Sequence, residues 1–393
     1  PNSSLITAMI TIIKYSFLTI LVMSMCIAGL LLTPFKQTIL NQLQMEANAH
    51  LNELITSPHS PQLSPLDPII GAPTIGNITA SVHTPFVNLN NAALNQWLTD
   101  SQTEVLIIQQ RGNIIHESYS DASNRGLAVN SMSMAKNVIA LLIGIAIDEG
   151  HIQSEHSNVL DYLPELNITD DASVSIRDML NHLSGIQTGF AELEKTLKGE
   201  PLTEQLSDIT FTENRQFRYD NINYHLLGII LSRVYQQPLN QVIDNKLWRP
   251  LNLEKADIIA STGYCCLFAT ARSWLAIGEL HLNKGMHDGE QIVPKKWIDT
   301  MITDYEIPED FFVQATGVSQ GNRYGYHVYG GLKAHPDYYW IEGMGLQTIF
   351  INPVSETIIV RLGGIPSLIR LHSNRWNQSL METPMSIVKE MTF

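Results

Sequence analysis

Residues 133–150 read SMAKNVIALLIGIAIDEG, a run in which apolar side chains surround the expected helix instead of lining one face. A helix that is apolar all round is buried in a protein interior. The run has a serine at its start and Gly150 as a stop signal. We therefore expect a buried helix. Its first turn carries Ser133 and Lys136 on one face, because residues three apart on a helix are neighbours.

Strand patterns precede this helix, and both helical and strand patterns follow it. Val105–Gln110 and Ile114–Tyr119 are apolar strand patterns around Arg111-Gly112-Asn113, which is typical of a hairpin. Helical patterns dominate residues 151–260. Two more helices and four short strands are expected at Thr270–Leu282, Pro294–Ile302, Tyr324–Tyr329, Tyr338–Ile341, Gln347–Ile351 and Thr357–Leu362. This order predicts an α/β (α+β) fold, with an antiparallel sheet flanked by helices and a mostly helical lobe.

Composition limits the function classes. The 393 residues are 44% hydrophobic and 16% charged, which allows a sizeable core and excludes wholesale disorder. The formal net charge is −14. Nucleic acids and anionic lipid surfaces bind clustered Lys and Arg, so neither is expected as the main ligand.

The N-terminal region contains an uncharged apolar run, Tyr15 to Phe35, between Lys14 and Lys36. Its length is sufficient for a membrane-spanning helix. A cleaved signal peptide is the alternative, with Cys26-Ile27-Ala28 as a small-x-small site, although the apolar run continues past it. We expect a retained anchor. One lysine flanks the apolar run on each side, so the distribution of positive charge does not predict the orientation of the helix in the membrane.

The chain divides into three parts on these patterns. Residues 1–36 are the expected anchor, residues 37–75 a polar stalk and Ser/Pro-rich linker, and residues 76–393 the folded domain, with its helical lobe at roughly 151–260. Cys265 and Cys266 are adjacent in sequence. Adjacent cysteines rarely meet disulfide geometry, so we expect no disulfide and small apolar packing instead.

The Ser133-x-x-Lys136 pair is the first candidate for chemistry. A serine hydroxyl is a poor nucleophile until a base takes its proton, and burial lowers the pKa of a lysine enough for that task. The helix N-terminus adds free N–H groups for an oxyanion. The alternative is a helix-capping serine with a solvated lysine. Ser386 and Lys389 have the same spacing, which shows how weak the motif is alone.

Tyr219-Asp220-Asn221 is the second candidate, since a tyrosine can relay a proton and an amide can orient a lysine and a substrate. An ordinary loop, with Asn221 capping the next helix, is the alternative. Gly317–Gly321 has the G-x-S-x-G form around Ser319. That motif needs a helix after it, and none is expected here, so we reject it.

An ordered set of blocks carries a family resemblance. NSMSMAKNVIALLIGIAIDEGHI, VLDYLPEL, VSIRDMLNHLSGI, FRYDNINYHLLGIIL, CCLFATARSWLAIGELHLNKG and IVPKKWIDTM resemble, in this order, successive blocks of the serine β-lactamase-related and penicillin-binding-protein-like family. The resemblance covers roughly residues 77 to 365. With the Cys-Cys block and the ending GMGLQTIFINPVSETIIVRLG, it is nearest the 6-aminohexanoate-dimer hydrolase and esterase group.

The resemblance implies a role for each matching position. Ser133 is expected to be the nucleophile and Lys136 its base or the partner of that base. Tyr219 would shuttle the proton and Asn221 would orient Lys136 and the substrate. Gly343 would allow close approach, and the Met344 N–H would be the second oxyanion donor. His182 matches a structural position.

One departure bears on the substrate. The family usually has Lys or His, then Thr or Ser, then Gly, in its third motif, and here the matching residues are Ile341-Glu342-Gly343. The cation that meets a substrate carboxylate is therefore absent. An ester or another amide is expected, rather than the substrates of a β-lactamase or D-Ala-D-Ala carboxypeptidase, which remain alternatives.

The resemblance implies a reaction without a cofactor, the N-terminal apolar run implies a membrane, and the altered third motif leaves a rival function open. No metal or organic cofactor is required, and the partners are a small ester or amide and a membrane, not nucleic acid. The expected location is the bacterial inner membrane, single-pass, with the catalytic domain on the periplasmic side. The rival is a membrane-anchored protein that keeps the fold for binding and has lost turnover.

Overall fold

The structure is a computed structural model, which describes residues 59, 64–72, 89, 91–121, 126–166, 168, 173–207, 209–302, 323–332, 334–363 and 383–390. All of these residues belong to the unit Glu53–Phe393. The predicted anchor at 15–35 and the rejected motif around Ser319 lie outside them. Among the residues described, no helix has the length and apolar character needed to cross a membrane.

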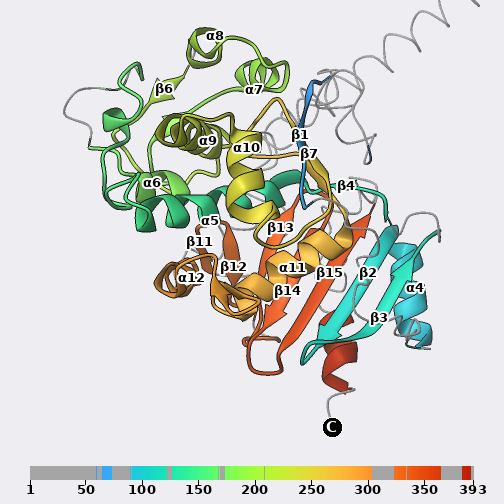
Figure 1. Ribbon diagram of the computed structural model, residues 1–393. Helices are drawn as coiled ribbons and strands as arrows, with labels where there is room; N and C mark the ends of the chain where they lie inside the picture. The colour runs from blue at the N-terminus through green and yellow to red at the C-terminus, as the bar shows by residue number, and fades with distance from the viewer. Residues whose placement is uncertain are drawn as a thin grey trace, which may run out of the picture. The chain divides into compact units, whose positions relative to one another are not determined.

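The main sheet has seven antiparallel strands in the order β11-β12-β13-β14-β15-β2-β3 (Figure 1). Their bounds are β2 Thr103–Gln110, β3 Asn113–Tyr119, β11 Arg323–Gly325, β12 Val328–Gly330, β13 Tyr339–Gly343, β14 Gln347–Asn352 and β15 Thr357–Gly363. The N-terminal hairpin joins the C-terminal strands through the β15–β2 pair. The predicted hairpin and three of the four C-terminal strands are thereby confirmed.

The prediction of a single strand at Tyr324–Tyr329 is wrong. This segment is a hairpin, β11 and β12, that turns at Tyr326 and His327. Both residues have positive φ, 52° and 59°, although neither is a glycine. Long-range contacts hold it, since Tyr326 donates to Glu155 and the His327 ring hydrogen-bonds the carbonyl of Glu342.

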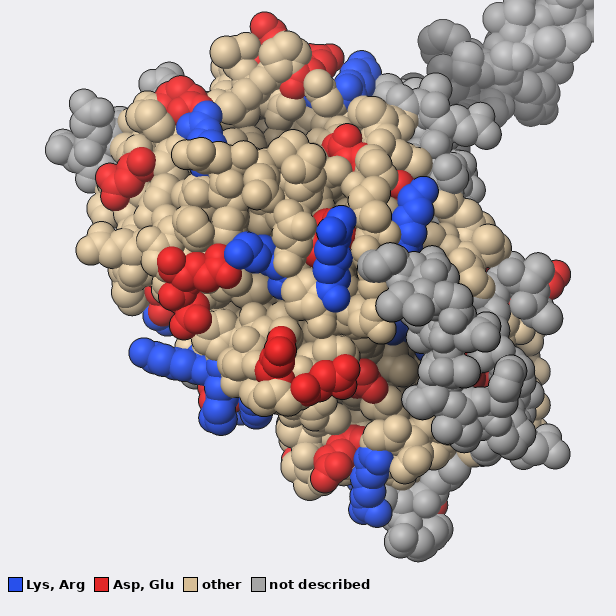
Figure 2. Space-filling view, in the orientation of Figure 1, with Lys and Arg blue, Asp and Glu red and all other residues tan. Residues whose placement is uncertain are grey.

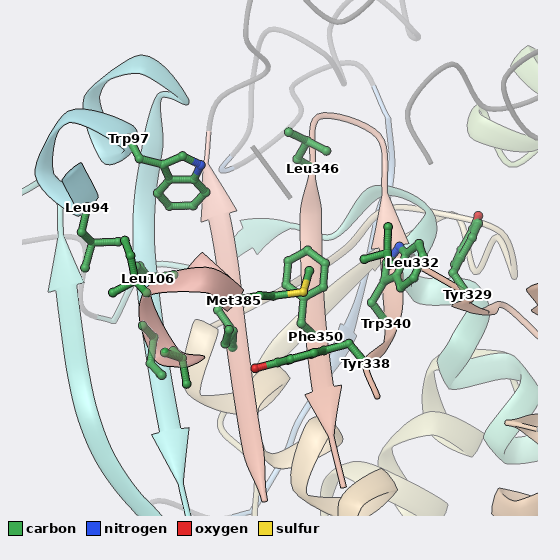
Figure 3. Close-up of a cluster of buried hydrophobic side chains, with 14 of the residues drawn as sticks. Leu94, Trp97, Leu106, Tyr329, Leu332, Tyr338, Trp340, Leu346, Phe350 and Met385 are labelled. Carbon is green, nitrogen blue, oxygen red and sulfur yellow. The ribbon is translucent and has the colours of Figure 1, made fainter. Parts of the chain in front are cut away.

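Helices cover both faces of this sheet. Helix α11 (Ala271–Leu282) crosses one face over β14, β15 and β2 (Figure 1). Helix α4 (Ala92–Asp100) and the helical segment 383–390 cover the other face. Figure 3 shows the apolar cluster on that second face, where Trp97, Phe350 and Met385 pack with Trp340 and its neighbours. The sheet therefore has the two-sided burial expected from its apolar strands.

A smaller antiparallel sheet has the order β1-β7-β8-β4, with bounds β1 Leu66–Ile69, β7 Ala256–Ile259, β8 Leu267–Ala269 and β4 Val129–Asn130. Strand β1 corrects the expected linker at 37–75 and the domain start at 76, because Leu66–Ile69 pairs with β7. Pro68 is tolerated because β1 is an edge strand, where a missing N–H breaks no ladder. The Ser/Pro-rich composition concealed this strand.

The predicted buried helix is α5 (Ala135–Asp148), preceded by the 3-10 turn η2 (Met132–Met134). It packs against α9 (Ile222–Tyr235), while η2 contacts β13 and β14. The remaining elements are η3 Val159–Asp161, α6 Ile176–Leu180, β5 Ile186–Gln187, α7 Phe190–Leu197, α8 Leu202–Leu206, β6 Thr210–Phe211, α10 Leu239–Ile243, a π-helical turn Asp244–Trp248, β9 Met286–His287, β10 Glu290–Gln291 and α12 Lys295–Met301. The expected fold, a helix-flanked antiparallel sheet with a mostly helical lobe, is confirmed.

On the face shown in Figure 2, acidic and basic side chains are interspersed. The described residues of that face therefore form no large field of one sign.

Candidate active site

Ser133 lies in the η2 turn, at the N-terminal end of the buried helix. The turn is fixed by its neighbours: the Met132 N–H donates to Asn130 Oδ1 at 2.9 Å, and the Ser131 N–H donates to the Leu267 carbonyl at 3.0 Å. Met132 has a φ of 49°, in the left-handed region. Backbone strain of this kind concentrates at functional sites. These two bonds attach the turn that carries Ser133 to β4 and β8.

Lys136 is fully buried, and its Nζ lies 3.0 Å from Ser133 Oγ and 2.7 Å from the carbonyl oxygen of Tyr264. Burial lowers the pKa of Lys136 well below the ordinary lysine value, and the carboxylate of Asp220 raises it in partial opposition. A lysine that is neutral near physiological pH can accept a proton. The solvated-lysine alternative is therefore wrong for this pair.

Tyr219 lies in the loop before α9 and reaches the nucleophile from there. Its side chain hydrogen-bonds Ser133 and Tyr329, and its ring centroid lies 5.0 Å from Lys136 Nζ. Burial raises the pKa of Tyr219, which keeps the phenol protonated. The ring of His182 packs against that of Tyr219, with centroids 4.5 Å apart. This contact gives His182 the structural role that its position implied.

Asn221 is the N-cap residue of α9, but its side chain makes no capping hydrogen bond. Its Oδ1 atom is buried, and no donor among the described residues reaches it. A buried acceptor without a partner is costly, so such atoms call for an explanation. The capping alternative is not supported, and the atom is free to accept from a substrate N–H.

Gly343 ends β13 directly against the nucleophile's turn. A Cβ atom at this position would overlap the carbonyl oxygen of Ser131 and stand 3.0 Å from the backbone nitrogen of Ser133. Only glycine permits this approach. The next residue, Met344, has an exposed side chain. The end of β13 thus brings its backbone to the turn that carries Ser133.

Ile341 and Glu342 occupy the places where a cation and a hydroxyl were expected. Ile341 is fully buried. The Glu342 carboxylate is also buried and accepts a hydrogen bond from the Trp340 indole at 2.9 Å. Burial raises the pKa of Glu342 to about 7, and its charge in turn raises the pKa of Tyr219. Neither residue supplies a positive charge to a substrate.

The cysteine prediction is wrong, because Cys265 and Cys266 form a disulfide with each other. They lie in the loop between β7 and β8, where Cys266 adopts a φ of 71°. Hydrogen bonds to distant segments hold that loop, so the pair meets a geometry that adjacent cysteines rarely reach. Residue type and spacing alone do not show such a loop conformation.

Sequence reasoning also missed Tyr264 and Tyr329. Tyr264 acts through its backbone carbonyl, which any residue carries, and Tyr329 through its contact with Tyr219. Neither has a local motif that would reveal it. The second Ser-x-x-Lys pair does not form a site: Ser386 Oγ lies 3.3 Å from His335 Nε2, and Lys389 is exposed.

Comparisons with known proteins agree with this geometry. Residues 104–262 match the family model Beta-lactamase. The 6-aminohexanoate-dimer hydrolase of Paenarthrobacter ureafaciens is 23% identical over 319 residues, which cover 70% of this chain and 75% of that protein.

Two solved structures are similar in fold. A putative 6-aminohexanoate-dimer hydrolase from Bacillus anthracis has a TM-score of 0.67 at 16% identity, over 88% of this chain and 94% of its own. A class C β-lactamase from Rhodobacter sphaeroides has a TM-score of 0.54 at 14% identity, over 75% and 98% respectively. These comparisons show that the chain has the β-lactamase/transpeptidase-like fold and support a serine hydrolase that is similar, over residues 104–262, to the Beta-lactamase family.

Proposed function

We propose that the protein hydrolyses small esters or amides through an acyl intermediate on Ser133. The observation that carries the proposal is the fully buried Lys136 amine, 3.0 Å from the Ser133 hydroxyl. A base that is desolvated and already in contact with its nucleophile needs no rearrangement to act.

The residues suggest the order of steps. Neutral Lys136 takes the proton of Ser133 as Oγ attacks the substrate carbonyl, and the backbone N–H groups of Ser133 and Met344 stabilise the oxyanion. Tyr219, held protonated, gives its proton to the departing alcohol or amine and regains one from Lys136. Water then attacks the acyl-serine, and the acid leaves with Ser133 restored.

The third motif favours a substrate without a carboxylate beside the scissile bond. Such a carboxylate would lose a charge-assisted hydrogen bond at Ile341, typically about 1.5–3 kcal/mol. The buried Glu342 carboxylate, which is ionised above its pKa of about 7 and whose charge acts on Tyr219, would also repel it. We therefore place esters and other amides ahead of penicillins, cephalosporins and D-Ala peptides.

The test combines active-site labelling with a substrate comparison. A fluorophosphonate should add its mass to the peptide that contains Ser133, and Ser133→Ala should abolish both labelling and turnover. On one preparation, kcat/KM for p-nitrophenyl butyrate should exceed that for nitrocefin. Label on Ser319, or label that persists in Ser133→Ala, would overturn the nucleophile. Equal turnover of nitrocefin would overturn only the substrate class.

The rival function, binding without turnover, makes a different prediction in the same assay. A binding protein would take up no phosphonate and hydrolyse no ester, although the fold is intact. The direct contact between Lys136 and Ser133 favours the enzyme.

A further inference from the structure

The Cys265–Cys266 disulfide lies in the loop that joins β7 to β8, next to the groups that hold the catalytic pair. Both cysteines are buried, with exposed fractions of 7% and 1%. The catalytic steps proposed above use neither cysteine. Their neighbours in the chain nevertheless contact both Lys136 and the turn that carries Ser133.

On the N-terminal side of the disulfide, the Tyr264 carbonyl accepts the 2.7 Å hydrogen bond of Lys136 Nζ. The Tyr264 hydroxyl is fixed in turn, 2.9 Å from Thr196 Oγ1. The peptide unit that begins at this carbonyl ends at the nitrogen of Cys265. Any movement of Cys265 therefore moves the acceptor that aims the Lys136 amine.

On the C-terminal side, the Cys266 N–H donates to the Met132 carbonyl at 3.2 Å. The Leu267 N–H donates to Ser131 Oγ at the same distance of 3.2 Å. These bonds attach the loop to the two residues that precede Ser133. The disulfide thus lies between an attachment to the base and an attachment to the nucleophile's turn.

The loop has a backbone conformation that needs external support. Ala260, Ser261 and Cys266 all have positive φ, between 42° and 71°. A non-glycine residue in this region is sterically strained, so a loop of this kind persists only when its surroundings fix it. The ring closed by the Cys265–Cys266 disulfide restricts backbone rotation at these two residues, which lie between the two attachments.

We propose that the Cys265–Cys266 disulfide is a positioning element of the active site, which holds the Tyr264 carbonyl and the Met132 carbonyl in register so that Lys136 meets Ser133. The inference rests on the proposed acyl-serine function. It makes the hydrolase sensitive to dithiols. One thiolate of the dithiol attacks a cysteine sulfur, breaks the protein disulfide and forms a mixed disulfide. The second thiol then closes the reductant's own disulfide, so two electrons pass to the protein and two protons end on the Cys265 and Cys266 thiols.

The experiment uses the full chain with Cys26→Ala, so that thiol chemistry reports only on the pair. Dithiothreitol is the reductant, and alkylation by iodoacetamide followed by mass spectrometry verifies the reduction. Reduced protein should lose at least about tenfold in kcat for p-nitrophenyl butyrate with KM changed by less than about twofold, because misplacement affects the chemical step. Reoxidation should restore kcat. The double variant Cys265→Ala/Cys266→Ala should have the low kcat in either condition.

The other outcomes are equally decisive. Verified reduction with unchanged kcat, while phosphonate still labels Ser133, would overturn this inference and leave the proposed function standing. Loss of the folded circular-dichroism spectrum in the reduced protein and in the double variant would assign the disulfide to stability and overturn the positioning role. Absence of labelling and turnover in the oxidised protein would overturn the proposed function itself, and this inference with it.

Discussion

Gly343 lies against Ser131 so closely that a methyl group at position 343 would overlap the Ser131 carbonyl oxygen. Two segments more than 200 residues apart in the chain, the end of β13 and the η2 turn, thereby meet backbone to backbone. Neither partner can yield by rotating a side chain. The distance between nucleophile and oxyanion donor is therefore set by main-chain packing.

Gly343→Ala should reduce kcat/KM for p-nitrophenyl butyrate by roughly 100-fold, because the backbone must shift where alignment of the reacting atoms matters most. Gly330→Ala is the matched control in the same sheet, since its Cβ would come no closer than 3.7 Å to any neighbour. Steady-state kinetics and melting temperature on both variants decide the matter. Wild-type kinetics in Gly343→Ala would show that this contact does not position the site.

The pH dependence of hydrolysis should reflect a lysine with a lowered pKa. Because Lys136 acts in its neutral form, kcat/KM should rise with pH and level off below the ordinary lysine value of 10.5. Asp220→Asn should move the midpoint lower still, since the Asp220 charge raises the pKa of Lys136. Asp299→Asn is the control, because this partly exposed carboxylate pairs with Lys284 and Lys295 and not with Lys136. A midpoint that stays fixed in Asp220→Asn would contradict the assignment of Lys136 as the base.

The buried helix and its Ser-Lys pair were predictable because the information is local: an apolar run marks burial, and three-residue spacing places two side chains together. The hydrogen-bond acceptor of Lys136 was not predictable, because Tyr264 lies 128 residues away and contributes only its carbonyl. The sequence did not predict the turn at Tyr326–His327 or the strand Leu66–Ile69, for a related reason. Long-range contacts override local propensity at both places.

The pKa of Glu342, raised by burial to about 7, predicts a specific stability profile. The folded protein binds this proton more tightly than the unfolded chain, whose ordinary value is 4.5. The stabilisation is complete below pH 4.5, falls as pH rises to about 7, and is then lost. Glu342→Gln keeps an acceptor for Trp340 and has no charge to bury, so it should be more stable than wild type at pH 8, by on the order of 3 kcal/mol, with little difference at pH 4.5. Urea unfolding at the two pH values measures this, with the exposed Glu290→Gln as control. If the free energy of unfolding differed equally between Glu342→Gln and wild type at both pH values, Glu342 would not be a buried group that titrates in this range.

Arg361 supports the turn that follows Gly343. Its guanidinium is buried and donates to the carbonyl oxygens of Gly345 at 2.6 Å, Leu346 at 3.1 Å and Ser101 at 2.7 Å. Gly345 and Leu346 both have positive φ, 78° and 62°, and a left-handed leucine needs such support. We expect Arg361 to hold the Met344 N–H where an oxyanion would form.

Arg361→Lys should therefore lower kcat for p-nitrophenyl butyrate by about 100-fold, the effect of losing one oxyanion donor, with a much smaller change in KM. A lysine keeps the charge but cannot donate in the planar fork that reaches several carbonyls at once. Thr103→Val is the matched control: it removes the hydroxyl that accepts from Arg361 Nε at 3.0 Å and contacts Ser101 Oγ, and it keeps the bonds from Arg361 to Gly345 and Leu346. It should cost about 1 kcal/mol of stability and leave kcat nearly unchanged. Millimolar guanidinium, far below denaturing concentration, should restore part of the activity of Arg361→Ala by occupying the vacated site. Parallel losses of kcat in Arg361→Lys and Thr103→Val would show that Arg361 contributes to stability alone, because only the former variant disturbs the carbonyls beside Met344.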